Sequence, residues 1–217
     1  MKADQSLARG IAIAFAVAAL LGVASALSNI MTEPQLMGQA PRTLAARFVV
    51  SMVLNSPAVW AGCAVLAGFL VRKRVLAVLV SPAALLIALT VHYGVGQLIE
   101  IMQPTIWREN AGWFVAAVVM GIPLGIIGAT ASRPSRMGLA AALVVPVAAI
   151  AEPLAFGYFG GLAHPHRPTG VGLLGAGVVL TLAGAPGAII VCRRWQRARS
   201  ERDAEGPSER TPEPTSV

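Results

Sequence analysis

Polar side chains interrupt the apolar segments of this sequence at a few positions, and these are the residues that could carry chemistry. Polar groups in a hydrocarbon environment are costly, so such positions are functional candidates by default. His92 and Glu152 are the candidates for titration, since both side chains can change charge when they are buried. The sequence predicts a candidate polar cavity formed by six residues: Asn55, His92, Tyr93, Gln97, Glu100 and Glu152.

Helical spacing brings several of these residues onto one face. Tyr93, Gln97 and Glu100 stand at positions i, i+4 and i+7, which share a helix face, and His92 lies beside them. The other two residues are expected at a similar depth in helices of their own. We therefore expect a shared polar cluster that opens toward the outer side of the membrane. The alternative is that these side chains only form interhelical hydrogen bonds, each worth about 0.6 kcal/mol.

Metal and catalytic motifs are weak or absent. His164 and His166 form an HxH pair that could bind a metal together with a carboxylate such as Glu152, but the prolines beside them favour a plain turn. We therefore expect neither a metal nor another cofactor. The sequence has no GxxxxGK loop, no HExxH and no GxSxG. It predicts a protein that is not an enzyme, and an intramembrane enzyme that uses Glu152 and the histidines is the weaker alternative.

Six apolar segments must position these residues. Hydrophobic residues make up 56% of the 217-residue chain and charged residues only 12%, whereas a soluble domain carries about 25% charged residues. A spanning helix needs about 20 mostly apolar residues. The sequence therefore predicts an all-α, polytopic transmembrane helix bundle with about six spans, over residues 10–27, 48–71, 75–101, 112–131, 137–159 and 170–192. Gly121, Gly125 and Gly128 form a stripe that favours close packing of the fourth span.

The two ends of the chain differ from the membrane domain at residues 10–195. Residues 1–9 are expected to form a cytoplasmic N-terminus. Residues 196–217 are rich in Ser, Glu, Arg, Pro and Thr, and such a segment cannot bury enough surface to offset its ordering entropy, so we expect a disordered cytoplasmic tail. Ala24-Ser25-Ala26, after the first apolar run, resembles a signal-peptide cleavage site. Cleavage there is an alternative that would leave five helices.

The placement of basic residues predicts the orientation. With the N-terminus inside, 13 of the 17 Lys and Arg residues fall on the cytoplasmic side, and the others are Arg42, Arg47, Arg108 and Arg167. Lys and Arg concentrate in cytoplasmic loops, so we expect both termini in the cytoplasm and the protein in the cytoplasmic (cell) membrane. The net charge of +7 does not indicate nucleic acid, because the charges lie in short clusters between apolar runs. The expected partner is the lipid bilayer, with a protein partner in the membrane as a further hypothesis.

Several local motifs lie between about residues 48 and 160. They are Asn55-Ser56-Pro57-x-x-Trp60-Ala61, Ala67-Gly68, Tyr93, Trp113, Gly121-x-Pro123-x-Gly125 and Glu152. With these motifs the chain resembles a family of multi-pass, about six-helix integral membrane proteins of actinobacteria whose activity is unknown. The resemblance implies a small helical membrane domain and places Asn55, Trp60 and Glu152 in one shared pattern. It implies no substrate and no catalytic residue.

The buried polar residues and the missing catalytic motifs together favour a function in binding. We expect a small permease-like or sensor-like bundle with a polar cavity open to the outer side. The alternative is a membrane-embedded interaction or structural subunit without a ligand site, in which the polar residues only hold helices together.

Overall fold

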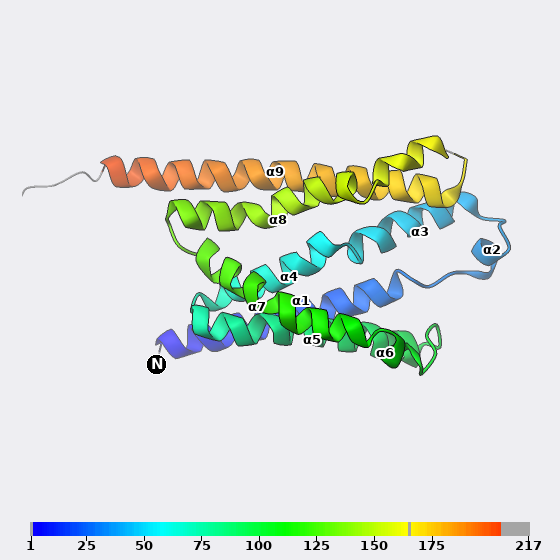
Figure 1. Cartoon of the computed structure of the whole chain (residues 1–217), viewed down its shortest axis with the longest axis horizontal. Coiled ribbons are helices and arrows are strands. Elements are labelled where there is room, and N and C mark those ends of the chain that lie inside the picture. The colour runs from blue at the N-terminus through cyan, green and yellow to red at the C-terminus, as the bar shows by residue number, and fades with distance from the viewer. Residues whose placement is uncertain (1, 165, 205–217) are drawn as a thin grey trace, which may run out of the picture.

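Long apolar helices form most of the computed structural model, which describes residues 2–164 and 166–204 (Figure 1). The elements in chain order are α1 (Lys2–Leu27), α2 (Glu33–Leu36), α3 (Pro41–Leu54), α4 (Pro57–Val71), α5 (Arg74–Leu98), α6 (Ile106–Glu109), α7 (Ala111–Ala131), α8 (Arg136–Ala155), the 3-10 helix η1 (Tyr158–Ala163) and α9 (Pro168–Ala204).

Six helical segments within the described residues are long and apolar enough to cross a membrane. Helices suit this environment because their backbone polar groups bond to one another and leave none to the lipid. The segments are Gln5–Leu27, Pro41–Val71, Arg74–Leu98, Ala111–Ala131, Arg136–Ala163 and Pro168–Glu201. The predicted all-α bundle with about six spans is therefore confirmed, and the chain is a multi-pass membrane protein.

The spans differ from the predicted boundaries at several ends, and at two of these ends the local sequence explains the difference. The second span begins at Pro41 rather than at residue 48, with this proline in the first turn of α3, where a missing backbone N–H costs nothing. The third span ends at Leu98 rather than at residue 101. Glu100 there adopts a left-handed conformation with φ 61°, a common way to terminate a helix.

The spans alternate in direction, and the basic connections gather at one end of the molecule. The N-terminal end of α1, the α4–α5 turn, the α7–α8 turn and the C-terminal end of α9 lie together at the left of Figure 1. The elements α2, α6 and η1 lie at the opposite end. The α4–α5 turn is a tight hairpin, since Arg72 ends α4 in a left-handed conformation and Arg74 begins α5. This arrangement is the one that an alternating basic pattern predicts for an even number of spans.

The last helix is longer than the sequence pattern predicts. Residues 196–204, which we expected in a disordered tail, continue α9 as helix. Extending an existing helix is much easier than nucleating one, and the Gln, Arg, Glu and Ala residues in this stretch are good helix formers. Residues 205–217 of the expected tail lie outside the described residues.

The helices pack as two groups that share one broken span. In the first group α4 and α5 each pack on the other and on α1 and α7, and in the second α3 and α8 both pack on α9. Helix α8 also contacts α4 and α7. The second span belongs to both groups, since α3 packs on α9 and α4 packs on α5 and α7. In Figure 1 the α3–α4 pair accordingly runs between α8 and α9 above and α1, α5 and α7 below.

Small residues allow the first group to pack closely, as the glycine stripe predicts. A Cβ atom on Gly125 would meet the backbone oxygen of Ala77, and one on Gly128 would meet that of Val65 at 2.0 Å. The hydroxyl of Ser81 on α5 donates to the carbonyl oxygen of Ala64 on α4 at 2.8 Å. Close contact between helices is the main source of stability in lipid, so this packing stabilises the bundle.

Candidate functional site

A break in the second span organises the candidate site. Pro57 has no backbone N–H and disfavours a helical conformation of the residue before it, and Ser56 is extended, with φ −70° and ψ 141°. The Ser56 hydroxyl oxygen caps α4 by accepting the backbone N–H of Val59 at 3.2 Å. The sequence predicted one continuous helix over 48–71. The structure corrects this to two helices, α3 and α4, that meet near the middle of a 31-residue span.

Side chains satisfy the backbone groups that the break leaves open, as a bilayer requires. The indole Nε1–H of Trp60 donates to the carbonyl oxygen of Leu54 at 2.9 Å. The backbone N–H of Ala58 donates to Oε2 of Glu152 at 2.8 Å. The break is therefore held both by its own chain and by α8.

Glu152 stabilises the break in the second span and does not line a cavity. Its side chain is 5% exposed, and its second carboxyl oxygen accepts the hydroxyl of Tyr158 at 3.0 Å. A carboxyl group at the first turn of α4 also faces the positive end of the helix dipole. Glu152 thus joins α8 and η1 to the start of α4.

A separate hydrogen-bonded chain links α1, the end of α3, and α5. The Ser25 hydroxyl donates to Oδ1 of Asn55 at 2.5 Å and lies 2.9 Å from Nδ1 of His92. The Asn55 amide nitrogen donates to the carbonyl oxygen of Ser51 at 2.8 Å. Ser25 is fully buried and His92 is 7% exposed. These four residues therefore form a polar network that runs from the buried Ser25 and His92 to the exposed Asn55.

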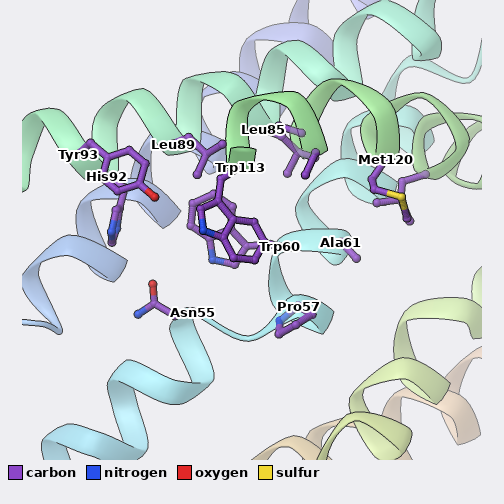
Figure 2. Close-up of a pocket in the computed structure, with 13 residues that line it drawn as sticks. Asn55, Pro57, Trp60, Ala61, Leu85, Leu89, His92, Tyr93, Trp113 and Met120 are labelled. Carbon is purple, nitrogen blue, oxygen red and sulfur yellow. The ribbon is translucent and has the colours of Figure 1, made fainter. Parts of the chain in front are cut away.

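Next to this network lies a cavity of about 450 Å³ between α4, α5 and α7. Its lining residues are Asn55, Pro57, Trp60, Ala61, Leu85, Leu89, His92, Tyr93, Trp113, Ala116, Ala117, Met120 and Leu124. Figure 2 shows His92, Tyr93 and Asn55 toward one end and Met120 and Ala61 toward the other, with the indole rings of Trp60 and Trp113 between them. The cavity is thus apolar along most of its wall and polar at one end.

Aromatic rings hold the polar end in shape. The His92 ring makes edge contacts with Trp60 and Tyr93, at centroid distances of 6.2 and 5.0 Å. Tyr93 also packs against Phe114 of α7 at 5.9 Å. Edge-to-face contacts of this kind favour fixed ring orientations, so the ring of His92 is held in place within the lining.

The structure divides the six predicted cavity residues. It brings Asn55, His92 and Tyr93 together at the cavity. Gln97 lies further along α5, where its side-chain oxygen accepts the Trp107 indole N–H at 2.8 Å. Glu100 is exposed beyond the end of α5.

Glu152 is the third predicted cavity residue that lies elsewhere, because it bonds to the start of α4 and is not part of the cavity lining. The shared cluster does not form because the break in the second span separates the two polar groups. Asn55, at the end of α3, bonds to Ser25 of α1, whereas the backbone N–H of Ala58, after the break, bonds to Glu152 of α8.

The histidine pair lies apart from these residues. Both His164 and His166 are exposed. No group of three or more His, Cys, Asp or Glu residues in the described part of the chain is placed to hold a metal ion.

Sequence reasoning missed two members of the site. Ser25 was noticed only within a cleavage-like Ala-Ser-Ala pattern, although a serine in an otherwise apolar span is itself a signal of interhelical bonding. Trp60 was named only within the resemblance pattern, although a tryptophan near the middle of a span does not fit the interfacial belts in which tryptophan is enriched. That misfit was the available sign of a role inside the bundle.

No protein-family model, no curated protein and no solved structure matches this chain. The resemblance over residues 48–160 therefore stays a prediction, and the site is interpreted from its own geometry.

Proposed function

We propose that this multi-pass membrane protein binds a small, largely apolar molecule in the cavity between α4, α5 and α7, as part of a permease-like or sensor-like role without catalysis. One observation carries the proposal: a cavity of about 450 Å³ has apolar walls and a hydrogen-bonded polar end. Ligand sites are typically concave, mostly apolar and about 300–1,000 Å³ in volume, with a few polar groups that fix orientation.

The broken span supports a permease-like role in particular. Transporters commonly place their binding sites at discontinuous helices near the middle of the membrane. In this chain the break lies beside the cavity and between the two helix groups, because α3 packs with α9 and α4 packs with α5 and α7. A ligand at the break would contact the junction between the two helix groups.

The proposed orientation puts the cavity in the outer half of the cytoplasmic membrane. The basic turns at Arg72–Arg74 and Arg133–Arg136 would face the cytoplasm, in keeping with the preference of Lys and Arg for that side. Trp113 is near the start of α7, and α6, which directly precedes α7, lies at the end of the bundle opposite to the basic turns (Figure 1). Trp113 and Met120 are 62% and 54% exposed, so an apolar molecule could reach the cavity from the outer leaflet.

One observation favours the alternative, a membrane-embedded interaction subunit. The span that contains α8 is the least buried of the six within the described residues, since only 11% of its most apolar 18-residue stretch is buried. Leu154 and Phe156 near its end are 68% and 63% exposed. A partner helix would cover this surface in the alternative, whereas lipid covers it in the proposed function.

Filling the cavity tests the proposal. The full chain in phosphatidylcholine nanodiscs would be dialysed to equilibrium against 2-naphthol, with the uptake of protein-free nanodiscs subtracted. We expect saturable binding, and a loss of roughly tenfold or more in Ala116→Phe, since overfilling a packed site costs about 1–3 kcal/mol.

Val119→Phe is the matched control on the same helix. Val119 is 60% exposed and does not line the cavity, so this variant should bind like the unchanged protein. Equal loss in both variants, or no saturable binding by the unchanged protein, would contradict the proposal.

A further inference from the structure

The polar end of the cavity contains an amide whose orientation is fixed by its neighbours. The side-chain nitrogen of Asn55 lies 2.8 Å from the carbonyl oxygen of Ser51. A carbonyl oxygen only accepts hydrogen bonds, so the NH₂ group must face Ser51. The other end of the amide, the acceptor Oδ1, therefore faces Ser25 at 2.5 Å.

This orientation decides the direction of the next hydrogen bond. An amide oxygen has no proton to give, so the single hydroxyl proton of Ser25 must point to Asn55. In any second hydrogen bond the Ser25 oxygen can therefore only accept. Its second neighbour is Nδ1 of His92 at 2.9 Å, and this nitrogen must consequently donate.

The network thus places a proton on Nδ1 of His92. A neutral imidazole has one N–H donor and one acceptor nitrogen, and the hydrogen bond at one nitrogen sets the state of the other. Nε2 is then an acceptor with a free lone pair. Among the described residues none forms a hydrogen bond with Nε2, although His92 is 7% exposed and lines the cavity.

The surroundings of His92 define what this acceptor can bind. The thirteen lining residues include no Asp, Glu, Lys or Arg, so a charged molecule would lie there without a partner, which is costly. Trp60, Trp113 and Tyr93 offer flat apolar walls. The Tyr93 hydroxyl also has no hydrogen-bond partner among the described residues.

We propose that the cavity selects an uncharged molecule with a planar apolar body and a hydroxyl or N–H group that donates a hydrogen bond to Nε2 of His92. This inference rests on the proposed function, because it assumes that the cavity binds a ligand. It adds the ligand's chemical class and the atom that recognises it.

A pair of probes that differ in one proton tests the inference. 2-Naphthol can donate a hydrogen bond, whereas 2-methoxynaphthalene has the same body and can only accept one. With the full chain in nanodiscs, we expect 2-naphthol to bind about 5- to 10-fold more tightly than its methyl ether, the effect of one net hydrogen bond. His92→Asn retains an amide N–H for Ser25 but has no acceptor at the position of Nε2, so it should bind both probes equally.

The outcomes separate the inference from the proposed function. Equal binding of the two probes by the unchanged protein overturns the inference and leaves the proposed function standing. Binding of neither overturns both. Tighter binding of the cation (2-naphthylmethyl)trimethylammonium would show that the aromatic walls form a cation site and would also overturn the inference.

A second measurement does not depend on how His92→Asn folds. The chain has three histidines, and replacing His164 and His166 with Gln leaves only His92. Nitrogen NMR of this protein, labelled with ¹⁵N-histidine, should show the proton of the neutral ring on Nδ1. A proton on Nε2 instead would overturn the inference.

Discussion

At the scale of single residues, a carboxyl group deep in the membrane is explained by the helix end that it contacts. Glu152 accepts one backbone N–H at the start of α4 and one hydroxyl from Tyr158. The identity of Glu152 as an important polar residue was predictable from the sequence, because a carboxyl group followed by proline is unusual in a span. Its partner was not, since the Ala58 N–H becomes available only through the break in the second span.

Glu152→Gln should lower stability without affecting ligand binding. Glutamine has one acceptor oxygen where glutamate has two, so the Ala58 N–H and the Tyr158 hydroxyl no longer both have an acceptor there, at a cost of about 1–3 kcal/mol in the free energy of unfolding. Thermal unfolding in detergent should show the loss, and 2-naphthol binding in nanodiscs should be unchanged.

Tyr158→Phe is the comparison for this change, because it removes the hydroxyl donor to Oε1 of Glu152 and keeps the bond from the Ala58 N–H to Oε2. It should also leave 2-naphthol binding unchanged. Loss of 2-naphthol binding in Glu152→Gln with unchanged stability would place Glu152 in the ligand site and contradict its assignment to the helix break.

At the scale of elements, the number of spans follows from composition but the break does not. Apolar residues continue through 48–71, and proline alone is no guide: Pro82 and Pro123 lie inside α5 and α7 without ending them. The second span breaks because Ser56 caps α4, and because Trp60 and Glu152 satisfy the opened backbone groups. Two of these contacts reach across the break or come from another helix, so local sequence patterns do not reveal them.

Gly128→Ala should destabilise the contact between α4 and α7. The added Cβ would lie 2.0 Å from the backbone oxygen of Val65, and relieving such overlap costs about 1–3 kcal/mol. The melting temperature in detergent should fall measurably.

Gly94→Ala in α5 is the matched comparison, since a Cβ there meets nothing within 4 Å. Replacing glycine with alanine in a helix interior usually stabilises by about 0.5–1 kcal/mol. The two substitutions should therefore shift the melting temperature in opposite directions. Equal shifts would mean that α4 and α7 do not pack closely at Gly128.

At the scale of the whole molecule, the alternation of basic turns and the arrangement of helices agree. Each basic cluster in the sequence follows an even number of spans, which predicts that all of these clusters lie on one side. Figure 1 shows the corresponding turns and helix ends together at one end of the molecule. The division into two helix groups was not predictable, since it depends on which apolar faces meet, and alanine-rich faces resemble one another in sequence.

Reporter fusions test the proposed orientation. A reporter fused after Arg194 should be active in the cytoplasm, and one inserted at His166 should be active outside, because three basic clusters favour the same side. Reporters that are active only in cytoplasm and those active only in the periplasm give independent readings. The reverse pattern would place the cavity in the inner half of the membrane.

Photoaffinity labelling tests the central claim, that the cavity between α4, α5 and α7 is a binding site. A diazirine derivative of 2-naphthol would be activated on the full chain in nanodiscs, and the labelled residues would be identified by mass spectrometry. The account predicts labels on lining residues such as Trp60, Tyr93 and Met120, and their loss when excess 2-naphthol competes. Labels confined to exposed lipid-side residues such as Val119 and Leu154, without competition, would contradict it.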